Sequence, residues 1–165
     1  MQQRAHDVQI EVERWISAPA DLIYGLIADY RTHHPAILPP AFSNLTVEQG
    51  GVGDGTVISF DLKLGGKQRR MLALISEPRP GVLQETDLEL GAATTFEVTQ
   101  QLNASRVVIQ TGFPSAPGIQ GWFERRFAPR MLRKLYAQEL DNLVAYASSQ
   151  PVGSANLAES APLAS

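Results

Sequence analysis

Apolar and polar residues alternate strictly near the start of the chain. In the stretch DVQIEVERWI, Val8, Ile10 and Val12 alternate with Gln9 and Glu11. A period of two residues is typical of a strand that buries one face. We therefore predict a strand that ends just before the segment SAPAD.

The segment SAPAD predicts the start of a short helix. Ser17 is expected to cap it, while Pro19 and Asp21 suit the first turn, where a missing N–H costs nothing and a carboxylate meets the positive end of the helix dipole. The apolar residues that follow have helical spacing: Leu22, Ile23, Leu26 and Ile27. We expect this helix to end near Arg31 and to be the first of a short pair, because Pro35 disfavours helical backbone at His34.

Short runs typical of strands then recur about every ten residues. They are FSNLTVEQ, GTVISFDLKL, KQRRMLALISE, GVLQETDLEL, TTFEVTQQL and SRVVIQTGF. Most are separated by turn signals such as LGGK and PRPG, whose glycines and prolines suit hairpin connections. Strands joined this tightly predict an antiparallel meander.

A long amphipathic segment closes the globular part of the chain. Its apolar residues follow a period of 3.6, namely Ile119, Trp122, Phe123, Phe127, Met131, Leu132, Leu135, Tyr136, Leu140, Leu143, Val144 and Ala147. Pro129 lies inside the pattern, so we expect a kink or a break near Phe127. The basic side of this helix has three possible roles: contact with a membrane surface, contact with a partner protein, or simple exposure to solvent.

This order of elements predicts an α+β helix-grip fold, in which a curved seven-stranded antiparallel sheet surrounds the long helix and leaves an internal cavity. Two short helices lie between the first and second strands. Residues 8–148 are expected to form this ligand-binding domain, with residues 1–7 flexible. Residues 149–165 consist of small and polar residues without periodicity, so we expect a disordered tail.

Composition excludes several classes of function. The 165 residues include no cysteine, which rules out disulfides, thiolate nucleophiles and sulfur-bound metals. A net charge of −3 predicts no nucleic-acid partner. The N-terminus lacks the apolar run of a signal peptide and no segment predicts a membrane span, so we expect a cytoplasmic protein.

Several segments resemble the START-related, or SRPBCC, superfamily of polyketide cyclases, lipid-transfer domains and birch-pollen-allergen-type proteins. They are ISAPADLIYGLIADY, GVGDGTVISFDL, EPRPGVLQE and RMLRKLYAQELDNLVAYA. The resemblance covers about residues 8–148. It implies a deep, mostly apolar pocket for hydrophobic small molecules, which in some members guides cyclisation or dehydration of a bound polyketide. It implies no cofactor.

The first candidate functional residues are the two adjacent histidines in the stretch ADYRTHHPAILPP. Joint ligation of a metal by His33 and His34 with Asp29 is disfavoured, because adjacent side chains on a helix or strand point in different directions. We expect no metal site. One interpretation is structural, with a histidine that meets the C-terminal dipole of the first helix. In the other, which follows from the resemblance, His34 acts in the pocket as an acid or base together with Tyr30.

The second candidate is the arginine pair of the run KQRRML. Arg69 and Arg70 are adjacent in a predicted strand, so only one of them points inward. We take Arg70 as the candidate for contact with a ligand or for catalysis. The alternatives are an ion pair with Glu85 or Asp87, or a solvated side chain.

Aromatic residues are the third signal, because a cavity fold lines its pocket with some of them. Core packing is the ordinary alternative for each. Met131 joins them as an adaptable wall residue beside Pro129. The candidate ligand-binding set is Phe60, Arg70, Phe96, Phe113, Trp122, Phe127, Met131 and Tyr136.

We therefore favour a protein that binds a hydrophobic or amphipathic small molecule between sheet and helix. The first alternative is a polyketide cyclase, aromatase or dehydratase that uses His34, Tyr30 and an inward arginine. The second is a protein-interaction module of the same fold. Two or more titratable groups on one pocket wall would favour the enzyme, an almost wholly apolar cavity the carrier, and a collapsed cavity the interaction module.

Overall fold

The computed structural model describes residues 8–113 and 118–151, with side-chain detail from residues 9–112 and 127–151. The elements in chain order are β1 (Val8–Ile16), α1 (Ala20–Ala28), α2 (His34–Ile37), β2 (Phe42–Gln49), β3 (Val57–Leu64), β4 (Lys67–Arg79), β5 (Val82–Asp87), β6 (Ala93–Gln101), β7 (Ala104–Phe113) and α3 (Gly118–Ser149). The predicted strands and the long helix are therefore confirmed. Their bounds differ from the expected ones by a few residues.

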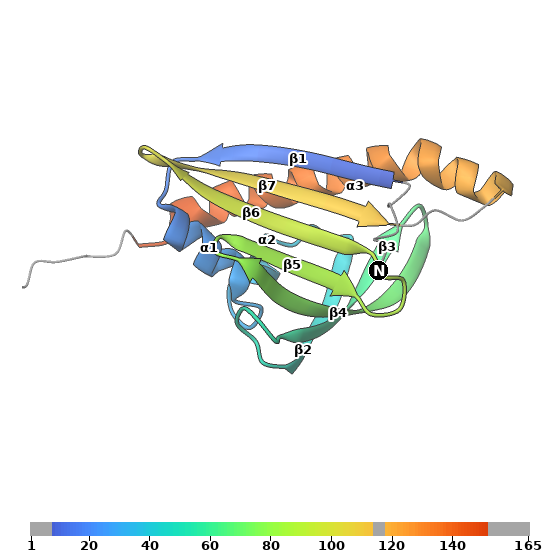
Figure 1. Cartoon of the computed structure of the whole chain (residues 1–165), viewed down its shortest axis with the longest axis horizontal. Coiled ribbons are helices and arrows are strands. Elements are labelled where there is room, and N and C mark those ends of the chain that lie inside the picture. The colour runs from blue at the N-terminus through green and yellow to red at the C-terminus, as the bar shows by residue number, and fades with distance from the viewer. Residues whose placement is uncertain (1–7, 114–117, 152–165) are drawn as a thin grey trace, which may run out of the picture.

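The strands form one antiparallel sheet of seven, in the order β1-β7-β6-β5-β4-β3-β2. Strands β2 to β7 follow one another as a meander, and β1 then pairs with β7 from Val8↔Phe113 to Ile16↔Ser105. The sheet curves, α3 runs along its concave face, and α1 and α2 lie at one end (Figure 1). The predicted helix-grip fold is confirmed.

The entry into the helix pair differs in detail from the prediction. Helix α1 begins at Ala20 with Pro19 as its N-cap residue, and no side chain caps it, so the predicted role of Ser17 is wrong. The helix ends at Ala28, earlier than expected, because Asp29 leaves helical geometry and accepts the backbone N–H groups of the next turn. Pro35 occupies the first turn of α2, where proline is tolerated, so it starts the second helix.

Helix α3 continues without interruption through Pro129, and the break predicted near Phe127 does not occur. The backbone of α3 approaches β1 and α2 most closely, while it stays farther from β3, β4 and β5. Asn142 on α3 donates a hydrogen bond to the carbonyl oxygen of Ile37 at 3.0 Å, which ties the helix to the end of α2. The part of the concave face near β1 is thus packed more closely against α3 than the part formed by β3, β4 and β5.

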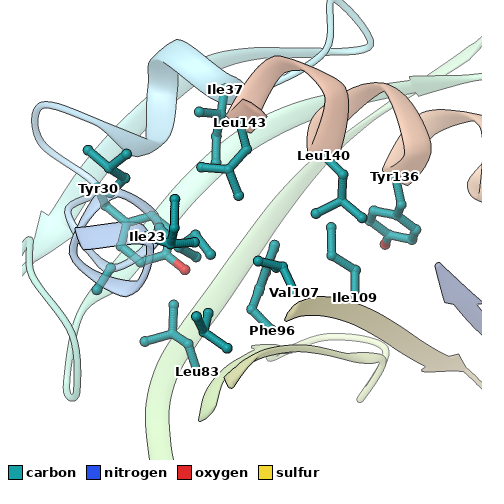
Figure 2. Close-up of a cluster of buried hydrophobic side chains, with 14 of the residues drawn as sticks. Ile23, Tyr30, Ile37, Leu83, Phe96, Val107, Ile109, Tyr136, Leu140 and Leu143 are labelled. Atoms are coloured by element: carbon teal, nitrogen blue, oxygen red, sulfur yellow. The ribbon is translucent and has the colours of Figure 1, made fainter. Parts of the chain in front are cut away.

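The closely packed part forms the hydrophobic core. Leu140 and Leu143 of α3 point toward Val107 and Ile109 of β7, and Ile23 reaches the same cluster from α1 (Figure 2). All five side chains are almost completely buried. Burial of such side chains stabilises the fold by roughly 1.5–3 kcal/mol each before entropy is counted.

We expect Leu140→Ala to lower the free energy of unfolding by about 2–5 kcal/mol, because it leaves a cavity in this well-packed cluster. Leu102→Ala is the matched control, since that side chain is 97% exposed, and it should change stability by less than about 0.5 kcal/mol. Urea denaturation of the three proteins measures the difference. Equal stability of the two variants would contradict the packing described here.

Candidate functional site

A cavity of about 360 Å³ lies between the sheet and α3. It occupies the half of the concave face that α3 does not approach closely. Alternate residues of each strand point into it because side chains in a strand alternate between the two faces. Most of the lining is apolar: Leu38, Phe42, Leu45, Ile58, Phe60, Leu62, Leu64, Met71, Ala73, Leu90, Ala92, Phe96, Ala128 and Leu132.

The alternation along β4 decides between the two adjacent arginines. Arg69 lines the cavity with Met71 and Ala73, whereas Arg70 lies on the outer face. There its guanidinium donates hydrogen bonds to Ser59 Oγ at 2.6 Å and to the carbonyl oxygen of Asn44 at 3.0 Å. The sequence left open which arginine points inward. The structure places Arg69 in the cavity wall, so the candidacy of Arg70 for contact with a ligand is corrected.

A row of polar side chains crosses the inner face at the enclosed end of the cavity. Strand register places Glu85 of β5 opposite Thr94 of β6, and Thr94 opposite Thr111 of β7. The two threonine hydroxyls lie 2.7 Å apart, and Thr111 donates a hydrogen bond to the Tyr136 hydroxyl at 3.0 Å. Burial raises the pKa of Tyr136 to about 12, so its hydroxyl stays protonated near neutral pH.

Glu139 of α3 faces the same polar row and is only 2% exposed. Its Oε1 atom is buried and has no hydrogen-bond partner among the residues that the structure describes. Burial, reinforced by the nearby carboxyl group of Glu85, raises the pKa of Glu139 well above its ordinary value. This environment favours the protonated form of the carboxyl group, which can donate a hydrogen bond.

Glu139 was missed in the sequence, although a signal for it exists. It lies three residues after Tyr136 and seven after Leu132, so it occupies the same face of α3 as these cavity residues. A carboxyl group within an otherwise apolar helical stripe needs an explanation, because glutamate is almost never fully buried without a partner.

His34 reaches the cavity from α2 and is 2% exposed. Its Nδ1 atom lies 2.7 Å from the carbonyl oxygen of Ile27 and must donate that hydrogen bond, because a carbonyl can only accept. In the neutral ring Nε2 is then unprotonated, and it lies 3.7 Å from Glu85 Oε1. Burial lowers the pKa of His34, an effect that the nearby Glu85 opposes in part. His34 is thus both a partner for the last turn of α1 and a neutral base on the cavity wall.

Tyr30 stands behind His34 and does not line the cavity. It is completely buried, its ring stacks on the His34 ring at 4.3 Å, and its hydroxyl donates a hydrogen bond to Glu85 Oε1 at 2.6 Å. Burial, together with the charge of Glu85, raises the pKa of Tyr30 well above its ordinary value. Tyr30 therefore positions His34 and Glu85 and has no access to a ligand in the cavity.

The aromatic candidates divide into three groups. Phe60, Phe96 and Tyr136 line the cavity as the sequence suggested. Phe127 and Met131 do not: they are 47% and 37% exposed, because the cavity wall of α3 is formed by Ala128 and Leu132, each one residue further along the helix and so about 100° around it. The side chains of Phe113 and Trp122 lie outside the described part of the structure.

The two adjacent histidines point apart, as the pattern suggested. His33 is partly exposed, and its Nδ1 atom lies 2.9 Å from the Tyr146 hydroxyl. Among the side chains of residues 9–112 and 127–151, no three His, Asp or Glu residues are arranged to hold a metal ion together.

The open end of the cavity has a different character. Lys67, Arg69 and Leu90 line it and are all exposed, in contrast to the buried His34 and Glu139. Arg69 forms an exposed ion pair with Glu89 at 2.8 Å. The cavity thus leads from a basic, solvent-exposed end past apolar walls to a buried polar end.

Comparison with solved structures supports the fold. The KanY protein, solved by NMR, is 28% identical with a TM-score of 0.78, and the match covers 86% of this chain and 98% of KanY. The protein TTHA0849 from Thermus thermophilus is 19% identical with a TM-score of 0.74 over 87% and 100%. The Zhui aromatase/cyclase from Streptomyces sp. R1128 is 16% identical with a TM-score of 0.71 over 86% and 93%.

Sequence comparison identifies the family. No curated protein matches the chain. In the described part of the chain, no helix combines the length and the apolar character needed to cross a membrane. A family model described as polyketide cyclase / dehydrase and lipid transport matches residues 7–148, which is most of the sequence. The chain belongs to this family.

Proposed function

We propose that this protein binds a hydrophobic or amphipathic small molecule in the cavity between the sheet and α3. The observation that carries the proposal is the cavity itself, about 360 Å³ with mainly apolar walls. Pockets for small molecules commonly measure about 300–1,000 Å³. The open cavity also argues against the interaction module considered from the sequence, which would have a collapsed interior.

The energetics of packing support the same proposal. A cavity lined by apolar side chains forgoes contacts that a filled interior would make, and each such void destabilises the fold. Phe60, Leu62 and Met71 all border this space. A ligand with an apolar body would restore those contacts and so stabilise the folded state.

We expect Ala73→Phe to weaken the binding of a neutral apolar dye, N-phenyl-1-naphthylamine, by at least about tenfold. Ala73 is buried on the inner face of β4, so the added ring occupies the cavity. Ala93→Phe is the control, because Ala93 lies next to Thr94 on the opposite face of β6. Dye fluorescence measures the affinity.

Ala128→Trp fills the cavity from α3 and should have the same effect, which guards against a folding defect particular to Ala73→Phe. Equal dye affinity in all four proteins would overturn the proposal. Native mass spectrometry of wild-type protein, followed by extraction, then identifies the class of any molecule it carries.

A second candidate function is acid–base catalysis of the cyclase or dehydratase type. The specific observation in its favour is that a base and a protonated acid, His34 and Glu139, line the same cavity. The family description and the Zhui aromatase/cyclase are consistent with it.

The chemistry requires no redox partner. His34 Nε2 would remove a proton from a carbon next to a ligand carbonyl, and that carbon would attack a second carbonyl carbon of the same molecule. The oxygen of the attacked carbonyl would take a proton from Glu139. In the dehydration that follows, protonated His34 would give its proton to the departing hydroxyl, which leaves as water, and the Glu139 carboxylate would take the second proton from carbon. Both groups then return to their starting protonation states.

We expect wild-type protein to accelerate exchange of the α-protons of decan-2-one with solvent deuterium, because neutral His34 can act as the base. His34→Asn should abolish the acceleration, since the amide can still donate to the Ile27 carbonyl but provides no base. His33→Asn is the matched control. NMR follows the exchange, and equal rates with wild type and His34→Asn would reject this second function.

The lowered pKa of His34 also predicts how stability depends on pH. Below the ordinary pKa of 6.5, His34 binds a proton in the unfolded chain but stays unprotonated in the folded protein. The free energy of unfolding therefore falls as the pH falls. The slope is at most about 1.4 kcal/mol per pH unit. His34→Asn should lose this slope and His33→Asn should keep it, as measured by urea unfolding between pH 7.5 and 5.

Glu139 contributes to the pH dependence of stability with the opposite sign. Because its pKa is raised in the folded state, its contribution lowers the free energy of unfolding as the pH rises. It is present in all three proteins and cancels in the comparison. The same pH slope in wild type and His34→Asn would contradict the assignment of a neutral, buried His34.

A further inference from the structure

The enclosed end of the cavity contains an excess of carboxyl groups. Glu85 reaches it from β5 and Glu139 reaches it from α3, while Asp87 lines the cavity two residues further along β5, next to Leu90. The other titratable lining groups at this end are His34 from α2 and Tyr136 from α3. Burial keeps His34 neutral, so no cation offsets the carboxyl groups there.

Two of these carboxyl groups have buried oxygen atoms without a hydrogen-bond partner in the part of the chain that the structure describes. They are Glu139 Oε1 and Asp87 Oδ2. The other oxygen of Asp87 accepts the backbone N–H groups of Glu89 and Leu90 at 2.7 and 2.9 Å. Buried polar atoms normally have partners, because an unpaired one loses its hydration without compensation. A polar group of a ligand would supply the missing partner.

The cations that line the cavity lie at its other end. Arg69 is 45% exposed and shares its charge with Glu89. The side chain of Lys67 is also exposed and forms neither an ion pair nor a hydrogen bond within the described residues. A charged group of a ligand can meet Lys67 without leaving water completely, so its desolvation cost there is small.

We propose that the enclosed end of the cavity is a binding subsite for an uncharged oxygen group, a hydroxyl or a ketone, and that it excludes carboxylates. A ligand that also has an acidic group therefore binds with that group at Lys67 and Arg69. The proposal rests on the proposed binding function and adds to it the orientation and the charge of the ligand.

The burial of Glu139 next to Glu85 explains the selectivity, because both disfavour a negative charge at this place. A protonated carboxyl group donates one hydrogen bond and accepts others, which suits a ketone or a hydroxyl. A carboxylate at the same place would lose its hydration and meet the charge of Glu85, which already disfavours ionisation of Glu139.

Three probes of equal chain length test the subsite: decan-1-ol, decanoate and 10-hydroxydecanoate. Their affinities are measured at pH 8 by displacement of N-phenyl-1-naphthylamine, below the concentrations at which they form micelles. We expect wild-type protein to bind 10-hydroxydecanoate most tightly, followed by decan-1-ol. Decanoate should bind at least about tenfold more weakly than 10-hydroxydecanoate, because it lacks the hydroxyl that the buried groups require.

Variants test the proposed roles of the two ends of the cavity separately. Glu139→Leu should remove most of the advantage of 10-hydroxydecanoate over decanoate, whereas Glu139→Gln keeps a donor and an acceptor and should preserve it. Lys67→Ala should lower the affinity for 10-hydroxydecanoate several-fold and leave the affinity for decan-1-ol unchanged. Lys63→Ala is the matched lysine control, because Lys63 is exposed and does not line the cavity. Thermal unfolding verifies that each variant is folded.

Wild-type protein that binds decanoate as tightly as 10-hydroxydecanoate would overturn the inference, and so would a Glu139→Leu variant with unchanged preference. Equal effects of Lys67→Ala and Lys63→Ala on 10-hydroxydecanoate would overturn the proposed orientation. In each of these cases the dye still binds in the cavity, and the proposed function stands. If none of the probes displaces the dye and Ala73→Phe binds it as wild type does, the proposed function itself fails.

Discussion

The structure depends on how α3 is seated against the curved sheet. The helix packs closely on β1 and α2, and the core between α3, β7 and α1 is tight around Ile109 and Leu140. Strands β3, β4 and β5 have few close backbone contacts with α3, and their inward side chains line the cavity together with Ala128 and Leu132 of the helix. The apolar side chains of those strands therefore surround a space. The hydrophobic effect that folds the chain on one side of the molecule leaves a ligand-sized cavity on the other.

The polar groups of the cavity impose a further cost on stability. Glu139 and Asp87 each bury an oxygen atom without a partner among the described residues, and His34 and Glu139 both have pKa values shifted toward their uncharged forms by burial. Replacement of such groups by apolar ones of similar shape is often neutral or stabilising. Their presence on the wall of one cavity is better explained by contact with a ligand than by stabilisation of the fold.

The two ends of the cavity make different demands on a ligand. Lys67 and Arg69 at the exposed end tolerate a charge, while the row of Glu85, Thr94 and Thr111 at the enclosed end offers hydrogen bonds in a setting where charge is costly. The proposed binding and the proposed catalysis would use the same geometry, because a site that held a carbonyl next to Glu139 and His34 would also hold it next to an acid and a base.

The sequence by itself determined the secondary structure and the order of its elements, because alternation along β1 and the period of 3.6 along α3 are local patterns that reflect which face is buried. It also identified His34, Phe60, Phe96 and Tyr136 as candidates that do line the cavity. Local patterns were insufficient for the cap of α1, where the backbone enters the helix through Pro19 without a capping side chain.

Only the tertiary structure decided which groups meet. The choice between Arg69 and Arg70 depends on the absolute phase of β4, which strand pairing sets and composition does not. The exclusion of Phe127 and Met131 depends on the rotation of α3 about its axis. Glu85, Thr94, Tyr136 and Glu139 are far apart in the chain and converge only because register aligns three strands opposite one helical face. That convergence, and the burial that shifts the pKa of Glu139, are properties of packing and have no local signature in the chain.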